Sequence, residues 1–271
     1  MEVSFGIKTW DPVRVRLEEK TNSPNSNQIR FTASNSTYYT FILVIDYTEF
    51  DNLSPRPTVR EMEITHGLNN LYTFSLQTPN VGYRLRYSTK YWLASSSDVI
   101  NSEFPYLIPI KEGRMVQSKK NSFTKISNSF SGNKADTIYC MRRGLVTAVP
   151  RPETFYFRIS DQDCLEVLHD DGTYMIYHFL NKKDDFTAPG RIVLPGQPIG
   201  TLSDSSYLWI NLVKIEKAKN FLVSQQISYT AGKPGTLTFD EIDGKERSVY
   251  PREVITMEMN RKELKQANRN P

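Results

Sequence analysis

Short strand-like runs separated by turn residues fill most of this sequence, and they constrain the fold more than any other feature. Residues 41–45 form an apolar, β-branched run, and residues 71–76 and 83–87 alternate between apolar and polar side chains. Such runs, punctuated by clusters of Asn, Ser, Gly and Pro, are typical of antiparallel sandwiches. A helical pattern is confined to residues 255–268. The sequence therefore predicts an all-β protein.

The length and one polar stretch predict two domains. A chain of 271 residues has room for two. Residues 94–103 are small and polar, and they lie between two strand-rich regions. We expect an immunoglobulin-like β-sandwich at residues 1–98 and a barrel-sandwich domain at residues 99–271. Residues 118–134, rich in Ser, Asn and Lys, are expected to form a long loop.

Charge and composition exclude several classes of function. The 34 basic and 30 acidic residues leave a formal net charge of +4, too small an excess to indicate a nucleic-acid partner. No apolar run approaches the ~18–20 residues that span a bilayer, so we expect no transmembrane segment. Two cysteines and three histidines leave little material for a zinc site built from thiolates or imidazoles.

Three glycine-containing segments follow one another in the second half of the chain. They read IYCMRRGLV at 138–146, CLEVLHDDGTYMIY at 164–177 and APGRIVLPGQPIG at 188–200. The Asp171-Gly172 pair between two apolar runs predicts a hairpin, where positive φ is cheap only for glycine, and we expect the same of Gly144. The close spacing of glycines in the third segment fits a tightly cornered barrel.

This order of segments resembles the core of the lysostaphin-type (LytM) zinc endopeptidases, which cleave peptide crossbridges in bacterial cell walls. The resemblance covers residues 138–214 and weakens outside them. It implies zinc ligands from an H-x-x-x-D motif and from the second His of an H-x-H motif. The first His of H-x-H and the His of a Y-x-H-L motif would assist the attacking water. The resemblance also implies a place in the periplasm or at the cell surface, after removal of a signal peptide.

The positions of the metal ligands and catalytic groups carry other residues in this chain. Phe179 stands at the His position of Y-x-H-L, and Tyr207 and Trp209 stand at the two His positions of H-x-H. Lys125 and Ser129 lie near the His and Asp positions of H-x-x-x-D. The resemblance therefore implies a degenerate relative, a pseudo-enzyme with no metal, no cofactor and no catalytic residue. These five residues would line its vestigial cleft.

The histidines do not replace the missing ligands. No His lies between His66 and His169, so the first ligand is absent under any local alignment. His178 is one residue out of phase with the Y-x-H-L position, and its side chain should face the opposite side of the strand unless a bulge re-aims it. His169 matches a structural position of the family, and we expect it to bond backbone beside a hairpin. We expect His66 in a surface loop.

The two cysteines admit two interpretations. The resemblance puts Cys140 and Cys164 on neighbouring strands. Each can be a small buried apolar residue. They can also form a disulfide, if the protein is exported and their Cα atoms approach within ~4.4–6.8 Å.

Four functions stay open at this point. The first is a non-catalytic cell-envelope protein that binds peptidoglycan or an envelope protein partner, with the aromatic residues either contacting the ligand or filling the space of the metal site. The second is an active zinc endopeptidase with misaligned ligands, which the shortage of histidines opposes. The third is a biotinyl or lipoyl carrier domain, which needs a lysine at the hairpin tip where this chain has Asp170 and Asp171. The fourth is a structural or adhesive surface protein.

Overall fold

The structure is a computed structural model, and it describes residues 13–19, 28–79, 81–94, 100–118, 128–150, 164–203, 207–216, 221–231 and 233–268. Strands account for 50% of residues and helices for 7%, which confirms the all-β prediction. The chain divides into two compact units, whose described residues fall within 13–94 and 100–268. The boundary that we expected between residues 98 and 99 touches 95–99, outside the described residues.

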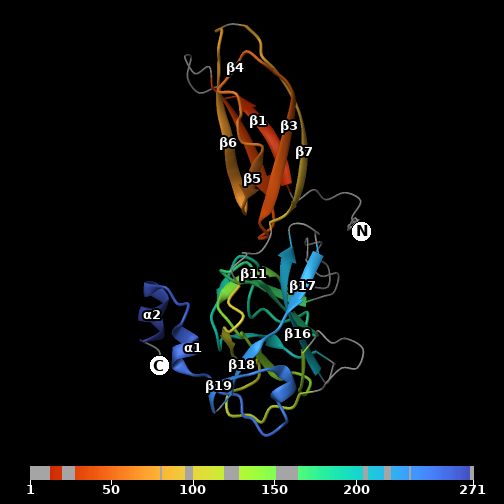
Figure 1. The fold of residues 1–271 in the computed structure, drawn as a ribbon, viewed down its shortest axis with the longest axis vertical. Helices are drawn as coiled ribbons and strands as arrows, with labels where there is room; N and C mark the ends of the chain where they lie inside the picture. The colour runs from red at the N-terminus through yellow and green to blue at the C-terminus, as the bar shows by residue number, and fades with distance from the viewer. Residues whose placement is uncertain are drawn as a thin grey trace. The chain divides into compact units, whose positions relative to one another are not determined.

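The first unit is a sandwich of two antiparallel sheets (Figure 1). One sheet has the order β1 (Val13–Glu19), β2 (Gln28–Asn35), β6 (Gly67–Leu76) and β4 (Leu53–Ser54), and the other has the order β5 (Glu61–Ile64), β3 (Phe41–Asp51) and β7 (Arg84–Leu93). Every second side chain from Phe41 to Ile45 is buried, as the apolar run predicted. Phe31 of β2 contacts Tyr47 of β3 and Tyr87 of β7, so the sheets pack face to face. An immunoglobulin-like topology stays a prediction.

The second unit contains three sheets around one core. The largest has the order β14 (Ile192–Val193), β11 (Gly144–Ala148), β12 (Cys164–Leu168), β13 (Tyr174–His178), β16 (Tyr207–Glu216) and β17 (Phe221–Gln225), with β9 (Asn128–Ser131) also paired to β16. The smaller sheets pair β10 (Thr137–Tyr139) with β15 (Pro198–Thr201), and β19 (Lys233–Leu237) with β18 (Ser228–Ala231) and β8 (Pro105–Tyr106). One cluster of buried side chains draws on all three, including Tyr106, Ile138, Tyr177 and Tyr229.

Helical structure is short and lies near the end of the chain, as predicted. A 3-10 turn at η1 (Phe239–Glu241) precedes α1 (Arg252–Thr256) and α2 (Arg261–Ala267). Asn260 begins α2, because its side chain accepts hydrogen bonds from the backbone N–H groups of Lys262 and Glu263. Among the described residues, none of these helices is long and apolar enough to cross a membrane.

Two local predictions need correction. The expected loop at 118–134 contains β9, which pairs with β16; residues 119–127 of it lie outside the described residues. Gly172 has the predicted positive φ of 78°, but Gly144 does not and lies at the start of β11 instead of in a turn. A Cβ on Gly144 would lie 2.6 Å from the backbone oxygen of Leu168. Close approach of β12, and not a left-handed turn, therefore requires glycine there.

Candidate functional site

Strand β16 presents two different faces to its surroundings. Leu208, Ile210 and Leu212 are buried and belong to the core. Tyr207 and Trp209 alternate with them and are half-buried, so they lie on the other face of the sheet. The predicted cleft residues of this strand therefore lie on the face that points away from the core.

Trp209 lies at the centre of the candidate site. It is the register partner of His178 on β13 and of Ser129 on β9, so all three side chains share one face. Phe179 follows the end of β13, and its ring centroid lies 5.7 Å from that of Trp209, with the planes at 82°. This edge-to-face geometry is favourable for two aromatic rings. Because Phe179 is 39% exposed, part of the pair faces solvent.

The other predicted site residues are placed as follows. Tyr207 is half-buried on the same face as Trp209 and is the register partner of Ser131. Ser129 is buried and offers little surface to a ligand. Lys125 lies outside the described residues. The structure thus brings Phe179, Trp209 and Ser129 together at one end of the sheet, with Tyr207 at the start of the same strand.

The prediction that His178 faces away from the site is wrong. His178 and Trp209 are register partners and share a face. The prediction assumed that side chains alternate through Phe179 as in a strand. However, β13 ends at His178, and Phe179 has a left-handed φ of 65°. In a regular strand, the neighbouring residues 178 and 179 would point to opposite faces. The left-handed turn at Phe179 breaks this alternation and places its ring against Trp209 as well.

His178 is a neutral imidazole beneath the aromatic pair. It is 7% exposed, and burial lowers its pKa to about 4. Its Nε2 lies 3.4 Å from Nδ2 of Asn211, while its Nδ1 and the Oδ1 of Asn211 are buried without a hydrogen-bond partner. A neutral imidazole at neutral pH contributes no charge to the site.

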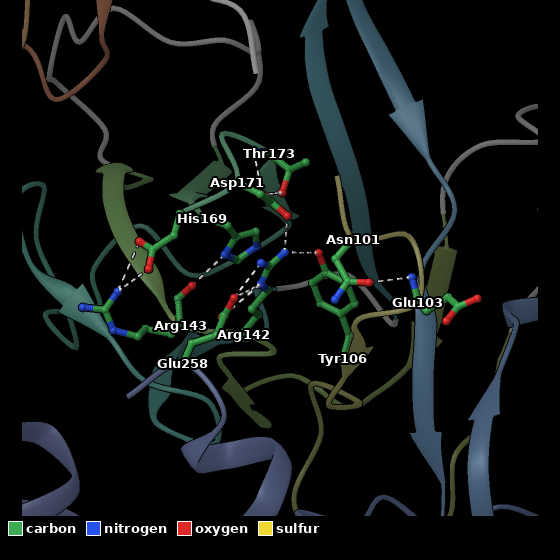
Figure 2. Close-up of polar contacts among 10 residues, drawn as sticks. Asn101, Glu103, Tyr106, Arg142, Arg143, His169, Asp171, Thr173 and Glu258 are labelled. Atoms are coloured by element: carbon green, nitrogen blue, oxygen red, sulfur yellow. Dashed lines mark hydrogen bonds and ion pairs between the residues drawn. The ribbon is translucent and has the colours of Figure 1, made fainter. Parts of the chain in front are cut away.

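Sequence reasoning missed a buried ion cluster at Arg142, shown in Figure 2. The Arg142 side chain is 3% exposed. Its Nε and Nη2 donate to the carboxylate of Glu258 at 3.0 and 2.6 Å, and its Nη1 donates to Asp171 at 2.8 Å and to the Tyr106 hydroxyl at 2.9 Å. The Phe104 ring lies 4.0 Å from the guanidinium carbon. The adjacent Arg-Arg pair in the sequence was the only signal, and it does not name these partners.

Arg143 makes a second link to the C-terminal helices. Its Nε donates to Glu263 of α2 at 3.0 Å, and its Nη1 donates to Asp170 at 3.1 Å. Glu258, which binds Arg142, lies between α1 and α2. The two arginines therefore join the β12–β13 hairpin to the helical end of the chain. This arrangement holds the two elements together.

The histidine at the hairpin is placed as predicted. Nδ1 of His169 lies 2.8 Å from the backbone oxygen of Arg143, to which it donates, and Nε2 is buried without a partner. Burial, followed by the positive charge of Arg142, lowers the pKa of His169 to about 3. His66 lies in an exposed turn of the first unit, also as predicted, where its ring stacks on Tyr38.

Both cysteines are buried thiols that are not joined in a disulfide. The expectation that they lie on neighbouring strands is wrong, because Cys140 follows β10, which pairs with β15, whereas Cys164 begins β12, which pairs with β11 and β13. Burial raises the pKa of the Cys140 thiol to about 12. A thiol with this pKa is not a nucleophile at neutral pH.

Acidification is expected to destabilise the second unit through its two buried histidines. The pKa values of His169 and His178, about 3 and about 4, lie below the ordinary value of 6.5. Below pH 6.5 the two histidines bind protons in the unfolded chain but stay neutral in the folded one. The free energy of unfolding therefore falls as the pH drops from 6.5 towards these values. Between pH 7 and pH 4.5 we expect the free energy of unfolding, measured in urea, to fall by up to about 5 kcal/mol, with about half from each histidine. The double variant His169→Gln/His178→Gln should lose much less over the same interval, and an equal loss would disprove the assignment.

The residues at the candidate site do not fit a zinc ion. Zinc in proteins takes imidazole, thiolate or carboxylate ligands. The aromatic pair supplies none, Ser129 is a hydroxyl, and His178 supplies one imidazole, whereas a zinc site takes at least about three protein ligands. Within the described part of the chain, no group of three or more His, Cys, Asp and Glu side chains is arranged to hold a metal ion. The site therefore offers an aromatic surface and not a set of metal ligands.

Comparison with known proteins gives distant structural likenesses. No protein-family model matches the chain, and no curated protein matches it significantly. Pseudoalterin, an M23 metalloprotease from the deep sea, is 14% identical with a TM-score of 0.35 over 55% of this chain and 96% of its own. Helicobacter pylori Csd3 is 9% identical with a TM-score of 0.33, over 96% of this chain and 76% of its own. A zinc-containing peptidase from Vibrio cholerae is 8% identical with a TM-score of 0.28, over 78% of this chain and 83% of its own. Likeness at this level leaves family and activity open.

Proposed function

We propose that this chain is a non-catalytic cell-envelope protein that binds peptidoglycan through the aromatic side chains of its second unit. The observation that carries the proposal is the edge-to-face pair of Phe179 and Trp209, in which Phe179 is 39% exposed. The sequence resemblance assigns these two positions to imidazoles of the zinc endopeptidases. The pair lies on the sheet face away from the core, at the end of two paired strands. An aromatic pair in this position is available to contact a ligand.

The chemistry of the neighbouring residues supports binding without hydrolysis. Peptide hydrolysis of this kind needs a metal to activate water and groups that stabilise the oxyanion. The aromatic pair can do neither. His178 shares its face but is buried, and Ser129 is buried as well. A pseudo-enzyme of the cell-wall endopeptidase type is the function that these residues support best.

The aromatic pair suits a ligand with flat or partly apolar surfaces. Aromatic rings give a large contact area at low conformational cost, and they dominate many binding sites. The sugar faces and short peptides of peptidoglycan offer such surfaces, together with polar groups around their edges. Tyr207, two residues before Trp209 on the same face, adds a hydroxyl to the site. The proposed location is the periplasm or the cell surface.

Metal analysis tests the non-catalytic half of the proposal. Protein purified without chelator and then dialysed should hold far less than one equivalent of zinc, because His178 alone cannot replace the full ligand set that supplies the ~10–16 kcal/mol of a structural zinc site. Added zinc should leave the melting temperature unchanged. The proposal would be refuted if one equivalent stays bound after dialysis and if a chelator then removes both the zinc and an activity on cell-wall peptides.

A further inference from the structure

Within the part of the first unit that the structure describes, strand β7 is an edge strand. It is last in the order β5-β3-β7, and among the described residues it pairs with β3 alone, from Leu93 opposite Phe41 to Arg84 opposite Asp51. It is 10 residues long. In an antiparallel edge strand, every second residue points its N–H and C=O away from the sheet. Such a row of unpaired groups is a template for a further strand.

The core is less well covered along β7 than along β3. Register partners in an antiparallel pair share a face. Leu43 and Ile45 of β3 are buried, whereas their partners on β7 are the half-buried Tyr91 and the exposed Thr89. Tyr87, which contacts Phe31 across the sandwich, is also only half-buried. A strand added beside β7 would cover these side chains.

The facing sheet packs beside β7. Phe74 of β6 packs on Phe50 of β3, and Phe31 of β2 packs on Tyr87 of β7. In the facing sheet, β1 follows β2 on the side away from β6. An incoming strand would hydrogen-bond to β7 and extend the β5-β3-β7 sheet.

The charges along β7 select the occupant. Its outward row carries Arg84, Arg86 and Lys90, all exposed. Glu49 pairs with Arg86 at 3.2 Å, and no ion pair is formed by Arg84 or Lys90 within the described residues. A second copy of β7 running antiparallel would put cations opposite cations, which is destabilising. An incoming strand with carboxylates on its outward face would pair with them.

We propose that β7 is a docking edge for an extended segment of a partner protein, in which acidic residues alternate with apolar or β-branched residues. The segment adds to the sheet as a strand. Its backbone bonds to β7, its apolar side chains cover Tyr87 and Tyr91, and its carboxylates face Arg84 and Lys90. This mode of recognition takes affinity from main-chain hydrogen bonds and selectivity from alternate side chains. The site is separate from the aromatic pair of the second unit.

The test uses the full chain and two blocked ten-residue peptides. In one, threonine or valine alternates with glutamate, and in the other lysine replaces each glutamate. Backbone amide exchange, measured residue by residue by NMR, should show that the glutamate peptide slows exchange at alternate residues of β7. We expect it to bind at least about tenfold tighter than the lysine peptide. The variant Arg84→Glu/Lys90→Glu, changed only at exposed positions, should reverse this preference.

Three outcomes would overturn the proposal. The first is no protection of β7 with the glutamate peptide at about 1 mM, the concentration that corresponds to a marginal affinity. The second is equal binding of both peptides, which would leave the charges of β7 without a role. The third is concentration-dependent protection of β7 without peptide, together with a dimer in sedimentation, which would make a second copy the occupant.

Discussion

The variant Arg142→Met is expected to lower the free energy of unfolding of the second unit by about 3–5 kcal/mol, because removal of one partner leaves buried charges without compensation. Glu258 and Asp171 both lie against the guanidinium, which also donates to the Tyr106 hydroxyl. Methionine keeps the length and apolar volume of the side chain, so packing changes little. The loss arises from two carboxylates, each less than a fifth exposed, that lose their shared cation.

Arg114→Met is the matched control for this loss. Arg114 bonds Asp136 at 2.6 Å in the same unit, but the two side chains are 40% and 26% exposed. Exposed pairs contribute at most about 1 kcal/mol, so this variant should stay close to the wild type. Urea unfolding at pH 7, followed by a probe specific to the second unit, separates the two. Equal losses in both variants would mean that the Arg142 cluster is not buried in solution.

Trp209→Ala is expected to weaken retention on purified cell-wall sacculi by about thirtyfold, which corresponds to ~2 kcal/mol. Its ring forms one side of the exposed pair with Phe179, and alanine removes the contact area. The stability cost should stay below the ~3–5 kcal/mol of a fully buried tryptophan, because Trp209 is half-buried.

Trp92→Ala provides the control for retention. Trp92 is also half-buried on a strand, but it lies on β7 in the first unit. Its loss should leave retention on sacculi unchanged. If Trp209→Ala lowers the melting temperature strongly and leaves retention intact, the aromatic pair fills space and the binding surface lies elsewhere.

The sequence was informative where the signal is local. The apolar run at 41–45 lies in β3, and the alternating runs lie in β6 (71–76) and, from Arg84, in β7. Alternation of apolar side chains matches the period of a strand. Gly172 marks its hairpin through its positive φ. The aromatic character of positions 179 and 209 is plain in the sequence, and the structure adds that the two rings touch.

Features that depend on residues far apart in the chain could not be predicted from the sequence. Arg142 and Glu258 are 116 positions apart, and no pattern in the sequence joins them. The face of His178 depends on where β13 ends, since the left-handed Phe179 breaks the alternation on which the phase argument relied. Strand β9 lies in a stretch rich in Ser, Asn and Lys, and its pairing with β16, not its own composition, makes it a strand.

Incubation of the wild-type protein with purified sacculi, in buffer with added zinc, tests the central proposal of binding without hydrolysis most directly. After centrifugation, the protein content of the pellet reports binding, and new amino groups in the supernatant report cleavage. We expect the wild type in the pellet, Trp209→Ala mostly in the supernatant, and no release of amino groups by either. Release of amino groups by the wild type, abolished by a chelator, would contradict the account, and so would a wild type that stays in the supernatant.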